Sequence, residues 1–303
     1  MALRGPLEGT LTALYTPMTA AGELDLPAFT RLAERLVAAG SGLVPCGTTG
    51  ETPTLSVDEY RVLVSRAVEV ARGRVPVIAG TGSSATRQTV EMTELAKGLG
   101  CDAALVVNPP YNKPPQVSLL AHFRAVADVG LPVLLYNVPS RTGSNIAAQT
   151  ALTLAEDRRF IGIKEAGGSL AQVEQLVAGA PEGFAVLSGD DGWTLPMMVL
   201  GARGVVSVAS NVAPEAVVRM VRAALSGDFA AARAEHYRLR PLFEALFLTT
   251  NPILVKRAAA LLGHSEGHVR LPLTVDAIEP KFETALVAAM RQAGLELVPG
   301  GVR

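Results

Sequence analysis

The chain has 303 residues, of which 49% are apolar and 18% charged, and its formal net charge is −1. This composition excludes a disordered chain, and the near-zero charge argues against nucleic acid or an anionic membrane as a partner. No apolar run reaches the ~18 residues of a membrane-crossing helix, and Cys46 and Cys101 show no metal-ligand spacing, so a cytoplasmic protein with reduced, buried thiols is expected.

Short apolar runs alternate with longer segments of helical periodicity from Thr10 onward. Ser56 and Glu59 form a capping-box pattern at the start of one such helical segment. The eight expected strands cover residues 11–15, 42–45, 75–79, 103–107, 132–136, 160–164, 185–188 and 205–208. Repeated strand and helix units imply parallel strands with right-handed crossovers, and eight units within about 200 residues favour a closed (β/α)8 TIM barrel over an open sheet.

The segment 229–297 has no strand pattern. It predicts three helices, with breaks near Asn251-Pro252 and over residues 263–272. We therefore expect a catalytic barrel over residues 1–226 and an appended C-terminal helical bundle over residues 227–303, packed directly on the barrel.

Lys164 ends the sixth expected strand. It is one of only five lysines among 27 basic residues, and the only one inside an apolar strand pattern. Lysine can lose its proton when it is desolvated, whereas arginine cannot, and a neutral amine is what imine chemistry requires. The alternative is a lysine that ends a strand and extends its amine to water.

Other candidate residues lie at or just after the carboxyl ends of the expected strands, where the active sites of barrel enzymes lie. They are Thr48, Thr49, Tyr111, Tyr136, Arg141 and Gly189. Gly162 shares the pleat face of Lys164, and we expect it to leave room for a ligand if that face points inward.

These residues suit an imine between Lys164 and a 2-oxo acid. Tyr136 could transfer protons, although it could also be a core tyrosine bonded to backbone. The backbone N–H groups at Thr48 and Thr49 could bind a carboxylate, and Arg141 a second one. The alternatives are a plain glycine-rich loop and a solvated arginine.

The sequence does not support three other kinds of site. Residues 80–85 (GTGSSA) match a dinucleotide-binding pattern, but the acidic residue expected at the end of the next strand is missing. No zinc spacing or phosphate-binding loop is present, so neither a metal nor a nucleotide cofactor is expected. Asp190-Asp191 fits a turn and helix cap better than a paired-carboxylate site.

Several motifs together carry a resemblance that spans the chain. They are GTLTAL at 9–14, CGTTGE at 46–51, YNVPSRTG at 136–143, GIKEA at 162–166, LSGDD at 187–191, GVVSV at 204–208, NPILVK at 251–256 and RLPL at 270–273. With them the sequence resembles the pyruvate-dependent class I aldolase superfamily and, within it, the dihydrodipicolinate synthase family.

The resemblance implies a role for each matching residue. Lys164 would form the pyruvate Schiff base, and Tyr136 would transfer protons. Thr48 would link Tyr136 to Tyr111, which would reach in from a neighbouring subunit.

The remaining matches concern substrate binding. Thr49 and the Thr48 backbone would hold the pyruvate carboxylate, and Arg141 would bind the carboxylate of L-aspartate 4-semialdehyde. Gly189 and Val206 would line the pocket.

The implied reaction is a lyase-type condensation of pyruvate with L-aspartate 4-semialdehyde, which begins diaminopimelate and lysine biosynthesis, in a cytoplasmic homotetramer. The nearest alternative is a sister aldolase for N-acetylneuraminate, 2-keto-3-deoxygluconate or 4-hydroxy-2-oxoglutarate. A catalytically silent binding barrel and a nucleotide-dependent oxidoreductase are the rivals from other classes.

One departure concerns regulation. Many members of the family bind lysine as a feedback inhibitor through an asparagine, a glutamate, a tyrosine and a histidine. The matching positions here are Ser84, Gln88, Pro110 and Val57. The carboxylate is absent from this set, so weak or no inhibition by lysine is expected.

Overall fold

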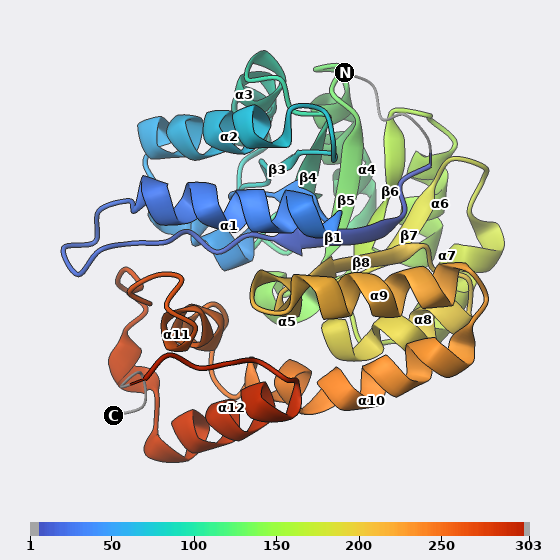
Figure 1. Cartoon of the computed structure of the whole chain (residues 1–303). Helices are drawn as coiled ribbons and strands as arrows, with labels where there is room; N and C mark the ends of the chain where they lie inside the picture. The colour runs from blue at the N-terminus through green and yellow to red at the C-terminus, as the bar shows by residue number, and fades with distance from the viewer. Residues whose placement is uncertain (1–5, 300–303) are drawn as a thin grey trace.

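The computed structural model describes residues 6–299 as a barrel of strands surrounded by helices (Figure 1). The strands are β1 (Gly9–Ala13), β2 (Gly42–Val44), β3 (Ile78–Gly80), β4 (Ala103–Val107), β5 (Val133–Asn137), β6 (Phe160–Glu165), β7 (Ala185–Ser188) and β8 (Gly204–Ser207). All paired strands are parallel, in the order β2-β1-β8-β7-β6-β5-β4-β3. A parallel bridge between Leu43 and Val77 brings β2 next to β3. The predicted TIM barrel is confirmed.

Helices follow the strands around the barrel. They are α1 (Leu26–Ala39), α2 (Val57–Ala71), α3 (Thr86–Gly98), α4 (Gln116–Ala127), α5 (Pro139–Thr142), α6 (Ala148–Ala155), α7 (Leu170–Gly179), α8 (Thr194–Val199) and α9 (Pro214–Leu225). The predicted capping box starts α2, because Glu59 N donates to Ser56 Oγ at 3.2 Å and Ser56 N donates to Glu59 Oε2 at 2.8 Å. Turns of 3-10 helix are η1 (Thr48–Gly50), η2 (Thr52–Thr54), η3 (Asp191–Trp193), η4 (Ala209–Asn211) and η5 (Val275–Ala277).

Two strands lie two or three residues from their predicted bounds, and the bounds of the other strands agree within one residue. The first was expected over 11–15 but pairs over Gly9–Ala13, and the third was expected over 75–79 but pairs over Ile78–Gly80. The first begins early because β1 and β8 approach closely where two glycines meet: a Cβ on Gly204 would lie 2.0 Å from the Gly9 carbonyl oxygen. Apolar periodicity does not reveal such a pairing register.

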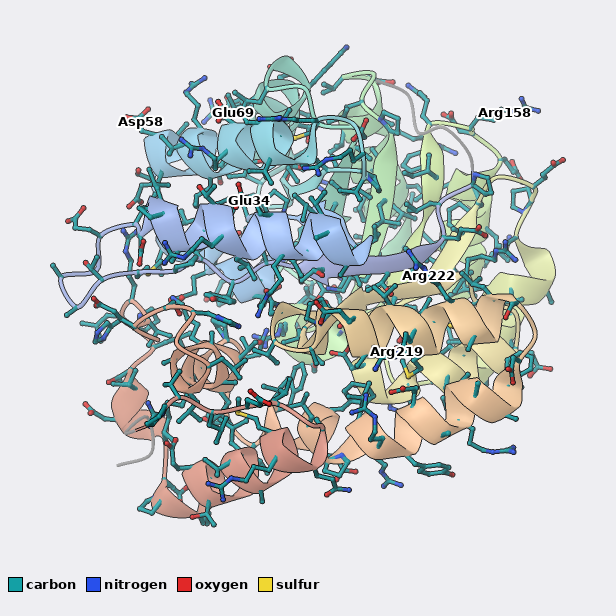
Figure 2. The ribbon with its side chains drawn as sticks, viewed as in Figure 1. Glu34, Asp58, Glu69, Arg158, Arg219 and Arg222 are labelled. Atoms are coloured by element: carbon teal, nitrogen blue, oxygen red, sulfur yellow. The ribbon has the colours of Figure 1, made fainter. Side chains whose placement is uncertain are left out.

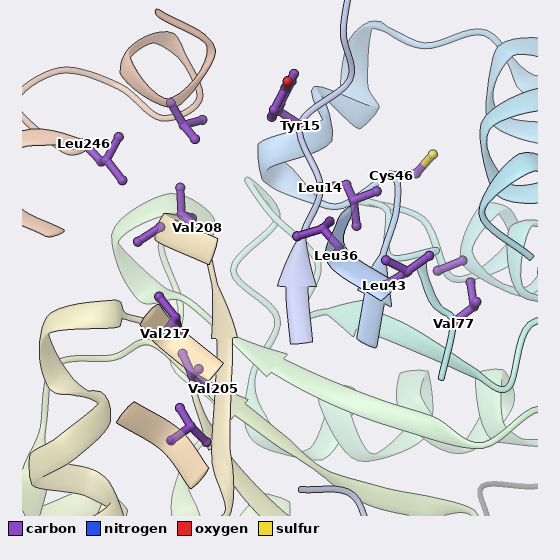
Figure 3. Close-up of a cluster of buried hydrophobic side chains, with 14 of the residues drawn as sticks. Leu14, Tyr15, Leu36, Leu43, Cys46, Val77, Val205, Val208, Val217 and Leu246 are labelled. Atoms are coloured by element: carbon purple, nitrogen blue, oxygen red, sulfur yellow. The ribbon is translucent and has the colours of Figure 1, made fainter. Parts of the chain in front are cut away.

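The protein has two apolar cores. One fills the barrel and contains residues from the inward faces of the strands, including Leu11, Leu134, Leu187 and Val206. The other lies between the strands and the helices, where Val205 of β8 packs with Val217 of α9 (Figure 3). Cys46 belongs to this outer core, and it and Cys101 are free and buried.

The C-terminal segment forms three helices, as predicted. They are α10 (Phe229–Ala245), α11 (Ile253–Leu261) and α12 (Pro280–Gln292). Helix α10 packs against α9, and α12 packs against α10 and α11, so the segment covers one side of the barrel (Figure 1). Two ion pairs also join the C-terminal segment to residues that follow β2. They are Lys256 with Glu51 and Arg270 with Glu59.

The outer surfaces of the helices carry charges of both signs. Figure 2 shows Glu34 on α1 and Glu69 on α2, while Arg219 and Arg222 lie on α9. Among residues 6–299, no helix combines the length and the apolar character needed to cross a membrane.

Candidate active site

Lys164 lies inside the barrel near the carboxyl end of β6. It pairs in register with Tyr136 of β5 and Leu187 of β7, both members of the inner core. The residue is 5% exposed, and its Nζ lies 4.1 Å from the centroid of the Tyr136 ring. The expectation that this face points inward is confirmed, whereas a lysine reaching out to water is excluded by the burial.

The two buried lysines have different partners. Lys256 in α11 is completely buried and forms an ion pair with Glu51. Within residues 6–299, by contrast, the amine of Lys164 makes no hydrogen bond or ion pair, and its recorded contact is with the Tyr136 ring. The Lys164 amine is therefore not held by a carboxylate, which leaves it available for addition to a carbonyl carbon.

Two glycines shape the surroundings of Lys164. A Cβ on Gly189 would lie 3.1 Å from both Cγ and Cε of Lys164 and 2.7 Å from Cβ of Ala166, so a larger residue would collide there. Gly162 was expected to leave room for a ligand, and this is wrong. A Cβ on Gly162 would lie 2.3 Å from the Ala185 carbonyl oxygen, so the space is taken by the backbone of β7.

The turn after β2 places Thr48 and Thr49 at the strand ends. They are the first two residues of η1, whose own hydrogen bonds run from Gly50 N to Gly47 O and from Glu51 N to Thr48 O. The N–H groups of Thr48 and Thr49 donate no hydrogen bond within this turn, as is usual at the start of a helical turn. Thr49 is buried, and Thr48 is half-buried.

Asn251 from the C-terminal segment connects two of the predicted substrate-binding residues. Its Nδ2 donates to Thr49 Oγ1 at 3.0 Å, and its carbonyl oxygen accepts a bond from Arg141 Nη2 at 3.4 Å. Arg141 lies in α5 and is exposed. The sequence marked Asn251 only as part of a helix break and a motif, so this contact was missed.

Tyr111 lies on the surface beside α5, the helix that carries Arg141. It is 91% exposed, and its backbone N donates to Thr142 O at 3.3 Å. Within residues 6–299, no hydrogen bond joins Tyr111, Thr48 and Tyr136. The relay through these three residues therefore stays a prediction.

Val206 faces the interior of the barrel and is completely buried in the same core as Tyr136. The structure thus gathers Lys164, Tyr136, Gly189 and Val206 around the carboxyl ends of β5 to β8.

Asp190 and Asp191 differ in their environments. Asp190 caps η3 by accepting a bond from Gly192 N at 2.8 Å, as predicted. Asp191 is buried and accepts bonds from Val208 N and Ala209 N, each at 2.9 Å. It therefore ties the end of β7 to the end of β8 in addition to its place in the turn.

The glycines of the GTGSSA segment have a packing explanation. A Cβ on Gly80 would lie 2.1 Å from Cys46 O, and a Cβ on Gly82 would lie 2.6 Å from Val107 N. These glycines let the backbone approach its neighbours, which accounts for the pattern that resembled a nucleotide-binding loop.

A groove of about 470 Å³ lies between α1 and α2, outside the barrel. Its lining includes Glu34 and Glu69, both labelled in Figure 2, and Arg66. Arg66 is paired with Glu69 at 3.1 Å, so its charge is already matched. The groove is lined by residues of α1, α2 and the turn that follows α2, and none of the strand-end residues lines it, so it is separate from the surroundings of Lys164.

Comparisons with known proteins agree with this geometry. Residues 6–293 match the model of the dihydrodipicolinate synthetase family. A protein of Thermomicrobium roseum named 4-hydroxy-tetrahydrodipicolinate synthase is 50% identical over 286 residues, with 94% of each chain covered.

Solved structures show the same likeness. The crystal structure of dihydrodipicolinate synthase from Aquifex aeolicus has a TM-score of 0.93 at 44% identity, covering 97% of this chain and 100% of that one. A structure described as the first monomeric dihydrodipicolinate synthase variant has a TM-score of 0.93 at 39% identity, covering 96% and 98%. With the match over residues 6–293, these likenesses show that the chain belongs to the dihydrodipicolinate synthetase family.

Proposed function

We propose that the protein condenses pyruvate with L-aspartate 4-semialdehyde, through an imine on Lys164, to give 4-hydroxy-tetrahydrodipicolinate. The observation that carries the proposal is the buried Lys164 amine, which has no carboxylate partner among residues 6–299 and lies 4.1 Å from the centroid of the Tyr136 ring. The relatives that match the chain are named for this synthase, which supports it over the sister aldolases.

The chemistry begins with the neutral amine of Lys164, which adds to the carbonyl carbon of pyruvate. The resulting carbinolamine loses water to give an iminium ion, which draws electrons from the methyl carbon. Loss of a methyl proton then gives an enamine, whose carbon attacks the aldehyde carbon of the second substrate. Tyr136 is the group we assign to these proton transfers, since its ring lies against the amine.

Two anion-binding groups orient the substrates in this proposal. The N–H groups of Thr48 and Thr49, with the Thr49 hydroxyl, bind the pyruvate carboxylate. Arg141 binds the carboxylate of the semialdehyde through two N–H groups. Gly189 and Val206 line the space between them.

The quaternary structure and compartment belong to the same proposal. We assign a cytoplasmic homotetramer built as a pair of dimers, in which the exposed Tyr111 side chain enters the site of the neighbouring subunit. We also assign the barrel to residues 1–226 and the helical domain to residues 227–303. This boundary falls between the end of α9 at Leu225 and the start of α10 at Phe229.

A turnover assay with defined aldehydes tests the function. Purified protein would be incubated with pyruvate and, in separate reactions, with L-aspartate 4-semialdehyde or an aldehyde substrate of each sister aldolase. We expect condensation with the semialdehyde at least 100-fold faster than with the others, on the order of 3 kcal/mol. The sugar-derived aldehydes have no carboxylate for Arg141, and the carboxylate of glyoxylate is bonded directly to its aldehyde carbon, two carbons nearer to the reacting atom than that of the semialdehyde. Preferential turnover of a sugar-derived aldehyde or of glyoxylate would contradict the proposal.

A further inference from the structure

Two buried polar residues lie directly behind the proposed catalytic pair. Asn137 follows Tyr136 in β5, Glu165 follows Lys164 in β6, and the two are partners in the strand register. Side chains alternate along a strand, so Asn137 and Glu165 point out of the barrel while Tyr136 and Lys164 point in. Asn137 is 0% exposed and Glu165 is 2% exposed. The proposed chemistry gives neither residue a role.

The carboxylate of Glu165 is held by neutral donors. Asn137 Nδ2 donates to both of its oxygens, at 3.1 and 3.0 Å, and the Gln172 Nε2 atom of α7 donates at 2.9 Å. Gly167 N donates at 2.5 Å. Burial raises the pKa of Glu165, while these hydrogen bonds oppose the rise. No lysine or arginine among residues 6–299 pairs with it, so the buried carboxylate is costly for stability.

The contacts of Glu165 join the ends of three neighbouring strands. Its side chain contacts Asn137 at the end of β5, and its backbone oxygen accepts a bond from Gly189 N, just beyond β7, at 2.8 Å. The loop after β6 is shaped around the carboxylate, because a Cβ on Gly167 would lie 2.5 Å from Glu165 Oε1. A residue that made only local contacts would not link these segments.

The hydrogen bond between Asn137 and Glu165 is supported by a second contact of the Asn137 side chain. The Oδ1 atom of Asn137 accepts a bond from Ile146 N at 2.9 Å, which orients its Nδ2 toward Glu165. Ala166 N also donates to Asn137 O at 2.9 Å, so the side-chain bond reinforces the backbone ladder where the two strands end.

We propose that Glu165 is a positioning residue that, through Asn137, fixes the Tyr136 ring relative to the Lys164 amine; this rests on the proposed function. Proton transfer depends steeply on such placement, because a shift of about 1 Å can slow a reaction by about 100-fold. The carboxylate form is required because all of its partners are donors. A glutamine would direct an NH2 group at one of them.

Two variants test this assignment, and a third provides a control. Glu165→Gln keeps the shape but replaces one acceptor by a donor, and Asn137→Ala removes the bridge from the other strand. Ser41→Ala is the control. Ser41 is also buried, and the change deletes bonds from its Oγ to Thr12 Oγ1, Thr10 O and Gly42 O at the start of β2, away from the ends of β5 and β6.

The measurement separates imine formation from proton transfer. Borohydride trapping with saturating pyruvate gives the fraction of chains that hold the imine. Exchange of the pyruvate methyl protons in D2O, which needs no aldehyde, gives the rate of proton transfer per trapped chain. All measurements are made well below the unfolding midpoint of each variant.

We expect Glu165→Gln and Asn137→Ala to keep the trapped fraction within twofold of the unsubstituted protein. Exchange per trapped chain should fall by about tenfold or more, and Ser41→Ala should stay within twofold on both readouts. If Glu165→Gln fails to fold, Asn137→Ala decides the question by the same criterion.

Three results would overturn the assignment. They are exchange within threefold of the unsubstituted protein in the Glu165 and Asn137 variants, an equal loss in the Ser41 control, and a loss of trapping with unchanged exchange per trapped chain. If the unsubstituted protein itself gives no adduct, the proposed function fails along with the assignment. If the unsubstituted protein shows normal trapping and exchange, a negative result in the variants contradicts only the positioning role of Glu165.

Discussion

Arg141 is the residue that the proposed mechanism gives to the second substrate alone. Its guanidinium is exposed, and its protein contact is with the carbonyl oxygen of Asn251, so it can accept a carboxylate. We expect Arg141→Gln to lower kcat/KM for aspartate semialdehyde by about 100- to 1,000-fold, the effect of losing a charged, bidentate contact. Trapping of the pyruvate imine should be unchanged.

The control for this change is Arg158→Gln, because Arg158 is also an exposed arginine (Figure 2) but lies outside the site. Arg158→Gln should leave kcat/KM for aspartate semialdehyde within twofold of the value for the unsubstituted protein. If Arg141→Gln also behaved like this control, the proposed carboxylate-binding role would be wrong.

His122 makes the stability of the protein sensitive to acid. It is 5% exposed, its Nδ1 lies 2.9 Å from Thr86 Oγ1, and burial lowers its pKa to about 4. The unfolded chain therefore takes up a proton at this residue at a higher pH than the folded chain does. The stability is fully present above the ordinary histidine pKa of about 6.5 and falls as the pH drops from there toward 4.

The contribution of His122 to the free energy of unfolding should fall by about 2–3 kcal/mol over this pH range, measured by urea unfolding at a series of pH values. His122→Gln cannot titrate, so its stability should depend less on pH across the same window. Equal pH dependence in both proteins would show that another group is responsible.

At the scale of elements, the turn that carries Thr48 and Thr49 is secured from the C-terminal segment. Glu51, which ends this turn, pairs with Lys256 of α11 and accepts a bond from Arg270 N at 3.0 Å. Lys256→Met would leave the Glu51 carboxylate buried without its cation. We expect a loss of about 3–5 kcal/mol, measured as a lower midpoint of urea unfolding.

The double variant Glu51→Gln/Lys256→Met removes both charges and should recover more than half of that loss. Restoration of this kind identifies the unpaired carboxylate as the cause. If the double variant were as unstable as Lys256→Met, the loss would come from packing instead.

Local patterns were sufficient to predict the elements but not the contacts between distant ones. The alternation of strands and helices predicted the barrel, and the Ser56 and Glu59 pattern predicted a cap, because both signals lie within a few neighbouring residues. The bond from Asn251 to Thr49 joins positions 202 residues apart, and no local pattern marks it.

The hydrogen bonds between buried polar residues behind the site were also not predicted from the sequence. Asn137 and Glu165 are the last residues of β5 and β6, one residue beyond the predicted ends of two apolar strands, where burial can continue, and a buried carboxylate needs donors. That signal was present in the sequence, but it does not say which residues supply the donors, since they come from another strand, a loop and a helix.

At the scale of the whole molecule, the exposed Tyr111 is expected to complete a neighbouring subunit. Subunits carrying Lys164→Ala and subunits carrying Tyr111→Ala should each be nearly inactive. After subunit exchange, half of the random dimers are mixed, and each contains one intact site, so about a quarter of the full activity should return. If Tyr111 acted within its own chain, mixing would restore nothing.

The expectation of weak or no feedback inhibition by lysine also concerns the assembled protein. Ser84, Gln88, Pro110 and Val57 supply no carboxylate for a cationic ligand, and the Gln88 side chain is already bonded to Ser83 Oγ at 2.6 Å. A direct assay of product formation should show turnover that is unchanged in sub-millimolar lysine and at most weakly lowered in millimolar lysine. Inhibition at sub-millimolar lysine would contradict this expectation.

The most direct test of the central claim is the site of imine formation. The protein would be incubated with pyruvate, reduced with borohydride, digested and analysed by mass spectrometry. We predict an increase of about 72 Da on Lys164, the mass of a reduced pyruvate imine, and no adduct in Lys164→Arg. The absence of this adduct, or its appearance on another of the five lysines, would contradict the account.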